Sequence, residues 1–266
     1  MITNPRSPRV RAAAKLAKKN ARSLTGLFLV EGPQSLSEAV QYVPELIDQV
    51  FLTPEAEERN QKLCLELSMA GVELVYVSEK VLETLSDTVS PQGIIAVCRQ
   101  PNPNLSEFLR QELKTVVILE QVRDPGNAGT IIRVADAAGI DGVIVTEESV
   151  DIFNPKVVRS TTGSLFHIPV FTGIPLATAI EALRSQGIKI YAADISGSSI
   201  IDARAAGKLS EPHAWLFGNE AHGLSAEDLQ SVDEALIIPI FGKAESLNLA
   251  TAASVCIYES AFAQRS

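Results

Sequence analysis

Four polar residues close to three apolar runs are the side chains in this chain best suited to chemistry. Asn127, Glu220 and Asn248 each lie in or beside a short connection between an apolar run and an expected helix. Arg133 follows Asn127 by six residues, which is about 9 Å along a helix axis at ~1.5 Å per residue. Connections at the carboxyl ends of parallel strands form the ligand sites of open α/β sheets. Together these residues predict a ligand-binding site.

Each segment alone also has an ordinary structural interpretation. Arg133 suits a helix residue in a salt bridge with Asp136 or Asp124, and Glu220 suits a carboxylate near the start of a helix. Asn127 can cap the helix that carries Arg133. The functional interpretation therefore depends on the three segments occurring together.

The segment 237–253 has the composition of a binding loop. A short apolar run is ended by Pro239, which lacks a backbone amide for pairing. Gly242 then permits a sharp turn, and Ser246 is expected to cap a helix rich in small residues. Small residues let another backbone or a flat ligand approach closely, so the segment predicts a loop that holds a ligand.

Several familiar catalytic signatures are missing from the sequence. No Gly-x-Gly-x-x-Gly follows an expected strand, no Gly-x-Ser-x-Gly elbow occurs, and Gly242 and Lys243 lack the upstream glycine of a phosphate-binding P-loop. These absences disfavour a Rossmann cofactor site, acyl transfer and nucleoside triphosphate hydrolysis.

Composition places the chain among globular proteins. Hydrophobic residues make up 46% and charged residues 21% of the 266 residues, near the usual values. No apolar run has the ~18–20 residues of a membrane span, and the basic N-terminus lacks the apolar stretch of a signal peptide. A cytoplasmic protein is therefore expected. Cys64, Cys98 and Cys256 are far apart and lack metal-ligand spacing, so neither a disulfide nor a metal is expected.

Basic residues are concentrated at the N-terminus of an otherwise acidic chain. Residues 1–26 carry seven basic residues and no acid; since the whole chain has a net charge of −9, the remainder is −16. A disordered basic tail is one interpretation, and an RNA-contacting arm is favoured because the charge is segregated. The residues expected to contact RNA there are Arg9, Arg11, Lys15, Lys18, Lys19 and Arg22.

The pattern of strands and helices predicts two α/β domains. A basic arm over residues 1–24, with a helix over 10–20, precedes a small α/β domain over 25–99. Two prolines mark a linker over 100–113. Residues 114–266 alternate strands with helices, which predicts a mostly parallel sheet flanked by helices. The expected strands cover 27–30, 47–52, 73–77, 93–98, 115–119, 142–145, 167–170, 188–193, 214–217 and 235–239, and the main expected helices cover 33–42, 54–69, 127–138, 175–185, 225–232 and 247–264, with further helices after Ser78 and Asn154.

Three stretches, in this order along the chain, resemble the signature motifs of one enzyme family. They read Leu-Glu-Gln-Val-Arg-Asp-Pro-Gly-Asn from 119, Leu-Phe-Gly-Asn-Glu-Ala-His-Gly-Leu from 216, and Ile-Ile-Pro-Ile-Phe-Gly-Lys-Ala-Glu-Ser-Leu-Asn-Leu from 237. The resemblance is to the SpoU (TrmH) family of RNA ribose 2′-O-methyltransferases, in the SPOUT superfamily. It implies S-adenosylmethionine as cofactor, a C-terminal trefoil knot and a homodimer. The opening Phe-Leu-Val-Glu-Gly-Pro from 28 resembles that family's L30e-like substrate-binding domain.

The resemblance also implies roles for individual residues. Arg133 matches the family's catalytic arginine, supported by Asn127, Glu220 and Asn248. Because a guanidinium stays protonated, we expect Arg133 to orient the target ribose and stabilise charge on its 2′ oxygen rather than act as a base. The positions that match the cofactor pocket are Leu216, Gly218, Ile238, Ile240, Ser246 and Leu247.

A fourth stretch, residues 154–169, offers further basic residues. Lys156 and Arg159 are about one helical turn apart and suit either RNA phosphate or a solvated face. His167, His213 and His222 have no acid at a useful spacing, so structural roles are expected for all three.

The function predicted from these features is methylation of a ribose 2′-hydroxyl in structured RNA. The two-domain layout and the basic arm favour 23S ribosomal RNA over tRNA as the substrate. A tRNA methyltransferase and a non-catalytic RNA-binding or assembly protein remain the alternatives. The presence of Arg133, Asn127, Glu220 and Asn248 together argues against the binding protein, which has no evident need for all four.

Overall fold

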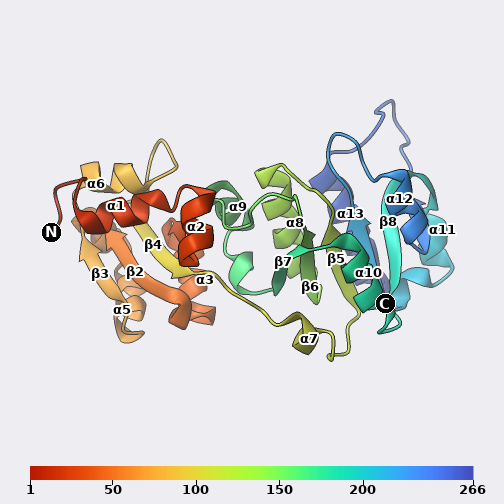
Figure 1. The fold of residues 1–266 in the computed structure, drawn as a ribbon, viewed down its shortest axis with the longest axis horizontal. Helices are drawn as coiled ribbons and strands as arrows, with labels where there is room; N and C mark the ends of the chain where they lie inside the picture. The colour runs from red at the N-terminus through yellow and green to blue at the C-terminus, as the bar shows by residue number, and fades with distance from the viewer. Residues whose placement is uncertain (266) are drawn as a thin grey trace. The chain divides into compact units, whose positions relative to one another are not determined.

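The computed structural model describes residues 1–265, which form two compact units (Figure 1). The first contains Met1–Pro101 and Asp151–His167, and the second contains Asn102–Val150 and Ile168–Ser266. The chain therefore passes between the units at three points. Residues 151–167 belong to the first unit, although the sequence analysis assigned them to the domain over 114–266. Ser266, the last residue of that range, lies outside the described residues.

The first unit is built on a mixed four-stranded sheet. Strand β4 pairs antiparallel with both β1 and β2, and β2 pairs parallel with β3, which gives the order β1-β4-β2-β3. The elements of this unit are α1 (Pro8–Lys15), α2 (Lys19–Thr25), β1 (Leu27–Glu31), α3 (Pro33–Tyr42), η1 (Pro44–Leu46), β2 (Ile47–Leu52), α4 (Pro54–Arg59), α5 (Gln61–Met69), β3 (Glu73–Tyr76), α6 (Glu79–Leu85), β4 (Ile94–Arg99), α9 (Pro155–Thr161) and η2 (Ser164–Phe166).

Two of the helices expected in this unit are each divided in two. The helix expected over 10–20 is replaced by α1, which starts at Pro8 with Ser7 as its cap, and by α2. The helix expected over 54–69 breaks at Asn60, whose φ of −127° is not helical. The Asn60 side chain instead donates to the carbonyl of Ala56 at 2.7 Å. Local bonds of this kind let asparagine compete with the helical backbone.

Residues 151–167 complete the core of the first unit. The ring of Phe28 in β1 lies 5.0 Å from that of Phe153 and 6.3 Å from that of Phe166, measured between centroids. Helix α9 packs against β1. The first unit is therefore discontinuous in sequence.

The second unit is built on a six-stranded sheet in which every pair is parallel. The strand order is β10-β8-β9-β5-β6-β7, so the first motif follows a central strand. The expected parallel sheet flanked by helices is confirmed (Figure 1). Its elements are α7 (Leu105–Phe108), β5 (Thr115–Leu119), α8 (Pro125–Ala137), β6 (Gly142–Thr146), β7 (Val170–Ile174), α10 (Leu176–Arg184), β8 (Lys189–Ser199), α11 (Ile200–Ala205), η3 (Lys208–Ser210), β9 (His213–Phe217), α12 (Ala226–Ser231), β10 (Glu234–Ile237) and α13 (Leu249–Ala263).

Helices bury both faces of this sheet. On one face, Ile118 and Leu216 belong to a core cluster with Leu183 of α10 and Phe108 of α7. On the other face, Trp215 donates to the hydroxyl of Ser260 in α13 at 2.8 Å. Strands buried on both faces explain the near-continuous apolar runs in the sequence.

Strands β7 and β8 of the second unit and the helix after β8 differ from the expectation. Strand β7 covers Val170–Ile174 rather than 167–170, because Ser164–Phe166 form a short 3-10 turn before it. Strand β8 continues to Ser199, well past 193, and leads directly into α11, which was not expected. Ser199 caps α11 by accepting from the amide of Ile201 at 3.2 Å.

Candidate active site

The three motif segments meet at the carboxyl edge of the parallel sheet. Strands β5 and β9 are neighbours and end at Leu119 and Phe217, which pair with each other in register. Asn127 lies in the first turn of α8 after β5, Glu220 lies in the loop after β9, and Asn248 precedes α13. Helices α8 and α13 pack against each other. The sheet therefore brings residues separated by more than a hundred positions into one site.

A chain of hydrogen bonds joins the three polar residues. The Asn127 side chain donates its amide to Glu220 Oε1 at 3.2 Å. Its oxygen accepts from the side-chain amide of Asn248 at 3.1 Å. These two bonds fix which end of the Asn127 amide faces each partner, because a carboxylate only accepts. Asn127 is therefore the central member of a Glu220–Asn127–Asn248 network.

Glu220 also fixes the loop that precedes α8. Its two carboxylate oxygens accept from the backbone amides of Arg123 at 3.1 Å and Asp124 at 3.0 Å. Partial burial acts to raise the pKa of Glu220, but it is outweighed by these bonds and by those from its own amide and from Asn127, so the pKa is lowered. The carboxylate is thus held ionised as the anchor of the first two motifs.

The helix caps differ from those expected. Asp124, not Asn127, caps α8, since its side chain accepts from the amide of Asn127 at 2.7 Å and Pro125 occupies the first turn. Asn248, not Ser246, caps α13 by accepting from the amides of Ala250 and Thr251 at 2.9 and 3.3 Å. These caps leave the side chain of Asn127 and the amide group of Asn248 available for the network.

Backbone geometry at two positions supports the second motif. A methyl group on Gly218 would lie 2.6 Å from the carbonyl carbon of Gly223, so no side chain fits there. The turn between them is closed by paired backbone bonds of Asn219 with Gly223 at 3.1 and 2.9 Å. Gln121 adopts a φ of +50°, which is uncommon for a residue with a side chain. Its carbonyl accepts from the Asn219 side chain at 2.8 Å, which ties the first motif to the second.

A cavity of about 510 Å³ opens beside this network. That volume lies in the range of small-molecule sites, ~300–1,000 Å³. One wall is apolar, with Ile195, Ile237 and Ile238 among its residues. The ionisable residues that line it are all acids, namely Asp194, Glu220 and Glu245. The cavity therefore suits an organic ligand with an apolar part and no need for a basic partner.

The residues expected to bind the cofactor divide into two groups. Ile238, Ile240, Ser246 and Leu247 line the cavity. Leu216 and Gly218 do not line it, since the Leu216 side chain is buried in the sheet core and Gly218 packs against Gly223.

Arg133 lies apart from the cavity. It is exposed on α8, does not line the cavity, and makes no hydrogen bond or ion pair through its side chain within residues 1–265. The salt bridge with Asp124 or Asp136, the alternative role suggested by the sequence, is therefore not formed. An exposed guanidinium without a partner is free to engage a ligand.

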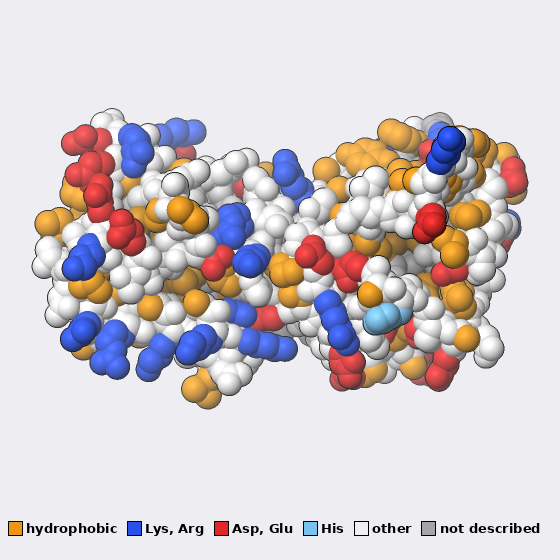
Figure 2. Space-filling model, turned by 90° about the horizontal axis from the view of Figure 1, so that it is seen from above, with side chains coloured by type: hydrophobic (Ala, Val, Ile, Leu, Met, Phe, Trp, Pro, Cys, Tyr) orange, Lys and Arg blue, Asp and Glu red, His pale blue; other side chains and the backbone are white. Residues whose placement is uncertain are grey.

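Most of the basic residues of the N-terminal segment are exposed. Arg11, Lys15, Lys18 and Lys19 lie on the surface of α1, α2 and their connection. Figure 2 shows Lys and Arg side chains in a row along the edge of the first unit. Arg9 is half-buried and paired with Glu73 and Gln49. Lys156 is exposed on α9.

Two residues predicted to contact RNA have acidic partners within the first unit. Arg22 is buried, only 2% exposed, and its guanidinium donates to Asp151 and to the carbonyls of Leu16 and Ala17. Its charge is therefore used inside the first unit. Arg159 is half-buried, and its guanidinium lies 3.1 Å from Asp87 and 3.8 Å from Glu31, so it is paired with acids of the first unit. Counting charged residues along the sequence cannot reveal either ion pair, because the partners are distant in sequence.

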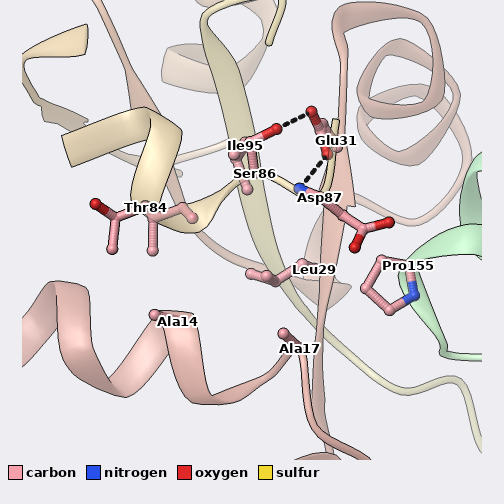
Figure 3. Close-up of a pocket in the computed structure, with 10 residues that line it drawn as sticks. Ala14, Ala17, Leu29, Glu31, Thr84, Ser86, Asp87, Ile95 and Pro155 are labelled. Atoms are coloured by element: carbon pink, nitrogen blue, oxygen red, sulfur yellow. Dashed lines mark hydrogen bonds between the residues drawn. The ribbon is translucent and has the colours of Figure 1, made fainter. Parts of the chain in front are cut away.

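Around Arg159, a carboxylate network fixes the loop that follows α6. Glu31 at the end of β1 accepts from the hydroxyl of Ser86 and from the amide of Asp87 (Figure 3). It also accepts from the hydroxyl of Thr88. The adjoining cavity, lined by Ala14, Ala17 and Pro155 among others, has a volume of about 50 Å³. It has room for only a few water molecules, so the network is structural.

The histidines occupy three different environments. His213 is buried between the carbonyl of Glu211 and the hydroxyl of Ser260, both at 2.7 Å from its ring nitrogens, and burial lowers its pKa. His167 lies 3.1 Å from Glu38, so it has the acidic partner that the sequence analysis did not find. His222 is exposed.

Metal and membrane sites are not found in the described residues. Within residues 1–265, no group of three or more His, Cys, Asp and Glu side chains is placed to hold a metal ion. Cys64, Cys98 and Cys256 are buried free thiols. No helix in this range has both the length and the apolar composition needed to cross a membrane.

Three residues of the site escaped sequence reasoning. Asp124 caps α8, Asn219 joins the first two motifs, and Asp194 lines the cavity. Asp124 could have been found, because Asp followed by Pro is a common helix start. Asp194 carries the weaker signal of an acid directly after an apolar strand.

Comparison with known proteins agrees with this geometry. Residues 114–258 match the SpoU rRNA Methylase family, and residues 7–96 match the MRM3-like substrate binding domain. The chain is 33% identical to the 23S rRNA (guanosine(2553)-2′-O)-methyltransferase RlmP of Bacillus subtilis, covering 97% of both chains. It is 31% identical to the 23S rRNA (uridine(2479)-2′-O)-methyltransferase of Streptomyces viridochromogenes, covering 92% of this chain and 86% of that one.

Solved structures give the same assignment. The AdoMet-bound rRNA methyltransferase from Sinorhizobium meliloti superposes with a TM-score of 0.84 at 32% identity, covering 97% of this chain and 96% of that one. The AdoMet complex of the SpoU methyltransferase AviRb from Streptomyces viridochromogenes gives a TM-score of 0.83 at 30% identity, with 98% and 99% covered. The three motifs, the parallel sheet and these likenesses over the whole chain agree, and the chain belongs to the SpoU rRNA methylase family.

Proposed function

We propose that this protein transfers the methyl group of S-adenosylmethionine to a ribose 2′-hydroxyl of 23S ribosomal RNA. The observation that carries the proposal is the Glu220–Asn127–Asn248 network, which unites all three motifs at the edge of one cavity. Relatives that cover nearly the whole chain are named for this reaction.

The residues of the cavity fit the cofactor. Adenine is flat and suits the apolar wall that contains Ile238, Ile240 and Leu247. The sulfonium and ammonium groups are cations, and the ionisable lining residues Asp194, Glu220 and Glu245 are acids. When bound, S-adenosylmethionine supplies an electrophilic methyl group on a positively charged sulfur.

The polar residues then have distinct tasks. Arg133 binds the phosphate next to the target ribose and stabilises negative charge as it forms on the 2′ oxygen. The new bond joins that oxygen to the methyl carbon, the carbon–sulfur bond breaks, and the hydroxyl proton is lost to water. Asn127 and Asn248 hold the edge of the site in position, and Glu220 fixes Asn127.

The first unit serves as the RNA-binding domain, with an L30e-like fold. Its exposed basic residues Arg11, Lys15, Lys18 and Lys19 contact phosphates, together with Lys156 of α9. Arg9 keeps some exposed surface and contributes from the same helix. Phosphate contacts of this kind supply affinity and orientation rather than sequence specificity.

The C-terminal segment forms a trefoil knot, and two subunits pair into a homodimer in the cytoplasm. The support for pairing is that Arg133 does not line the cavity of its own chain, so it serves the cavity of the partner subunit. Tyr258 and Phe262, both partly exposed on α13, give an apolar surface for this contact.

Mapping of ribose methylation tests the proposal. RNA from cells with and without the gene is compared for 2′-O-methyl groups across all ribosomal and transfer RNAs. We expect one position in 23S rRNA to lose its methyl group. Loss of a methyl group from a tRNA instead would show that tRNA is the substrate. An unchanged methylation pattern, combined with no binding of S-adenosylmethionine at millimolar concentration, would favour a non-catalytic RNA-binding protein.

A further inference from the structure

One acidic residue of the cavity lies level with the glycine turn of the second motif. Strands β8 and β9 are parallel neighbours, and Ala192 pairs with Leu216. The pairing of the two strands ends there, and Asp194 and Gly218 each come two residues later. A methyl group on Gly223, which packs against Gly218, would lie 4.0 Å from Asp194 Oδ2. Asp194 therefore lies in β8 just past its pairing with β9, beside the turn.

The carboxylate of Asp194 is held in a fixed orientation. Its Oδ1 accepts from the backbone amide of Ser196 at 2.9 Å and from the Ser196 hydroxyl at 2.6 Å. Its Oδ2 accepts no hydrogen bond from any residue within 1–265. Asp194 thus has one anchored oxygen and one free oxygen, and it lines the cavity.

The other two acids of the cavity lack this combination. Both oxygens of Glu220 are occupied by Arg123, Asp124 and Asn127. Glu245 lies in the exposed loop between β10 and α13. Asp194 is therefore the lining carboxylate that is both oriented and available to a ligand.

An acid just past the last paired residue of one strand, beside a glycine turn that follows the neighbouring strand, is similar to the arrangement that holds a ribose hydroxyl in nucleotide-binding α/β sheets. We propose that Asp194 Oδ2 accepts a hydrogen bond from a hydroxyl group on the ribose of the cofactor's adenosine. This inference rests on the proposed function, because it assumes that an adenosyl ligand occupies the cavity. Asp194 is a positioning and specificity residue, which selects adenosyl ligands over deoxyadenosyl ligands.

Calorimetric titration tests the inference without any measurement of activity. The ligands are S-adenosylhomocysteine, which lacks the cationic sulfur, and its 2′-deoxy and 3′-deoxy ribose analogues. The wild-type protein should bind one deoxy analogue about 10- to 100-fold more weakly than the parent, as expected for loss of a hydrogen bond to a charged group. In Asp194→Asn this ratio should fall to about threefold or less, since a neutral acceptor forms a weaker bond.

Two further variants serve as a stronger test and as a control. Asp194→Ala removes the acceptor and should abolish the discrimination. Asp202→Asn, an equal charge change at an exposed position on α11 that does not line the cavity, should keep the wild-type ratio.

The contradictory outcomes are distinct. If Asp194→Asn and Asp194→Ala keep the wild-type ratio of parent to deoxy-analogue affinity, the carboxylate does not bind a ribose hydroxyl and the inference is wrong. It is also wrong if both variants lose affinity for S-adenosylmethionine alone, because Asp194 would then act on the cationic sulfur. If the wild-type protein binds neither S-adenosylmethionine nor S-adenosylhomocysteine, the proposed function fails and takes the inference with it.

Discussion

At the scale of single residues, the three network residues are held by hydrogen bonds, whereas the proposed catalytic arginine is free. Glu220, Asn127 and Asn248 are joined by hydrogen bonds within the chain. Arg133 is exposed and unpaired within residues 1–265. A preorganised network with one free cation suits a reaction in which the protein orients a substrate and the cofactor provides the reactive group.

Replacing Arg133 with lysine tests this division of labour. Arg133→Lys keeps the charge but loses the planar fork of donors, so we expect methyl transfer at saturating RNA to slow by about 100-fold. Affinity for RNA, measured by filter binding, should change by less than about threefold because the charge is kept. Arg110→Lys, at an exposed position outside the site, is the matched control. Near-normal turnover of Arg133→Lys would contradict the role assigned to the fork.

A second residue-scale prediction concerns His213 and pH. Burial lowers the pKa of His213 in the folded chain, whereas an unfolded histidine titrates near ~6.5. Below that pH the unfolded chain binds a proton that the folded chain does not, so the free energy of unfolding should fall as pH drops through about 6.5. One such group contributes a slope of at most ~1.4 kcal/mol per pH unit.

Urea unfolding between pH 8 and pH 5.5 measures this slope. His213→Gln should be destabilised at pH 8 and lose less stability than the wild type on acidification. His222→Gln, which changes an exposed histidine, should follow the wild-type curve. Parallel curves for wild type and His213→Gln would show that another group controls the pH dependence.

At the scale of elements, the site depends on how two helices begin. Asn248 caps α13 through its oxygen and donates to Asn127 through its amide group. The same side chain therefore stabilises a helix and positions a neighbour. The helix and the network can be separated because the two atoms of the amide serve different partners.

Two substitutions at this position separate the two effects. Asn248→Ala removes the cap and should lower the free energy of unfolding by about 1 kcal/mol. Asn248→Asp keeps an acceptor for the cap but cannot donate to Asn127, so it should retain stability while slowing methyl transfer. Urea unfolding and a tritium-transfer assay measure the two quantities. Equal destabilisation by both changes would mean that the contact with Asn127, and not the cap, stabilises the helix.

The elements themselves were largely predictable from the sequence, and their ends less so. Apolar runs such as 115–119 and Pro-initiated helices such as α3 and α9 are local signals, and they appear as expected. The break at Asn60 and the start of β7 were missed, because they depend on side-chain competition and on a short turn rather than on periodicity.

The site was predicted in part, for a similar reason. The motifs identified Asn127, Glu220 and Asn248, whose hydrogen bonds the structure supplies. Spacing could not identify Asp194, which faces the cavity only because β8 lies next to β9. Spacing also could not show that Arg22 is buried in an ion pair, since its partner Asp151 is 129 residues away.

At the scale of the whole molecule, the chain passes between its two units three times. Residues 151–167 leave the second unit after β6 and complete the core of the first. Asp151 begins this segment and pairs with the buried Arg22 at 2.6 Å. The core of the first unit therefore includes residues that follow β6 of the second unit in the sequence.

Removing Asp151 should destabilise the first unit selectively. Asp151→Ala leaves the charge of Arg22 buried and unpaired, which costs about 3–5 kcal/mol. Hydrogen exchange should show reduced protection in 1–101 and 151–167. The fluorescence of Trp215, the single tryptophan, should change little because it lies in β9 of the second unit. Glu147→Ala, at an exposed position in the second unit, is a control that should leave protection unchanged. A uniform loss of protection in both units would contradict separate folding of the first.

The central claim is ribose methylation of ribosomal RNA, and one reaction tests it most directly. Purified protein is incubated with tritium-labelled S-adenosylmethionine and 23S rRNA from cells that lack the gene, and the label is then mapped to a nucleotide and to the base or the ribose. The account predicts label on a single ribose 2′ oxygen, with about 100-fold slower incorporation by Arg133→Lys. Label on a base, or no label from protein that binds the cofactor and the RNA, would contradict it.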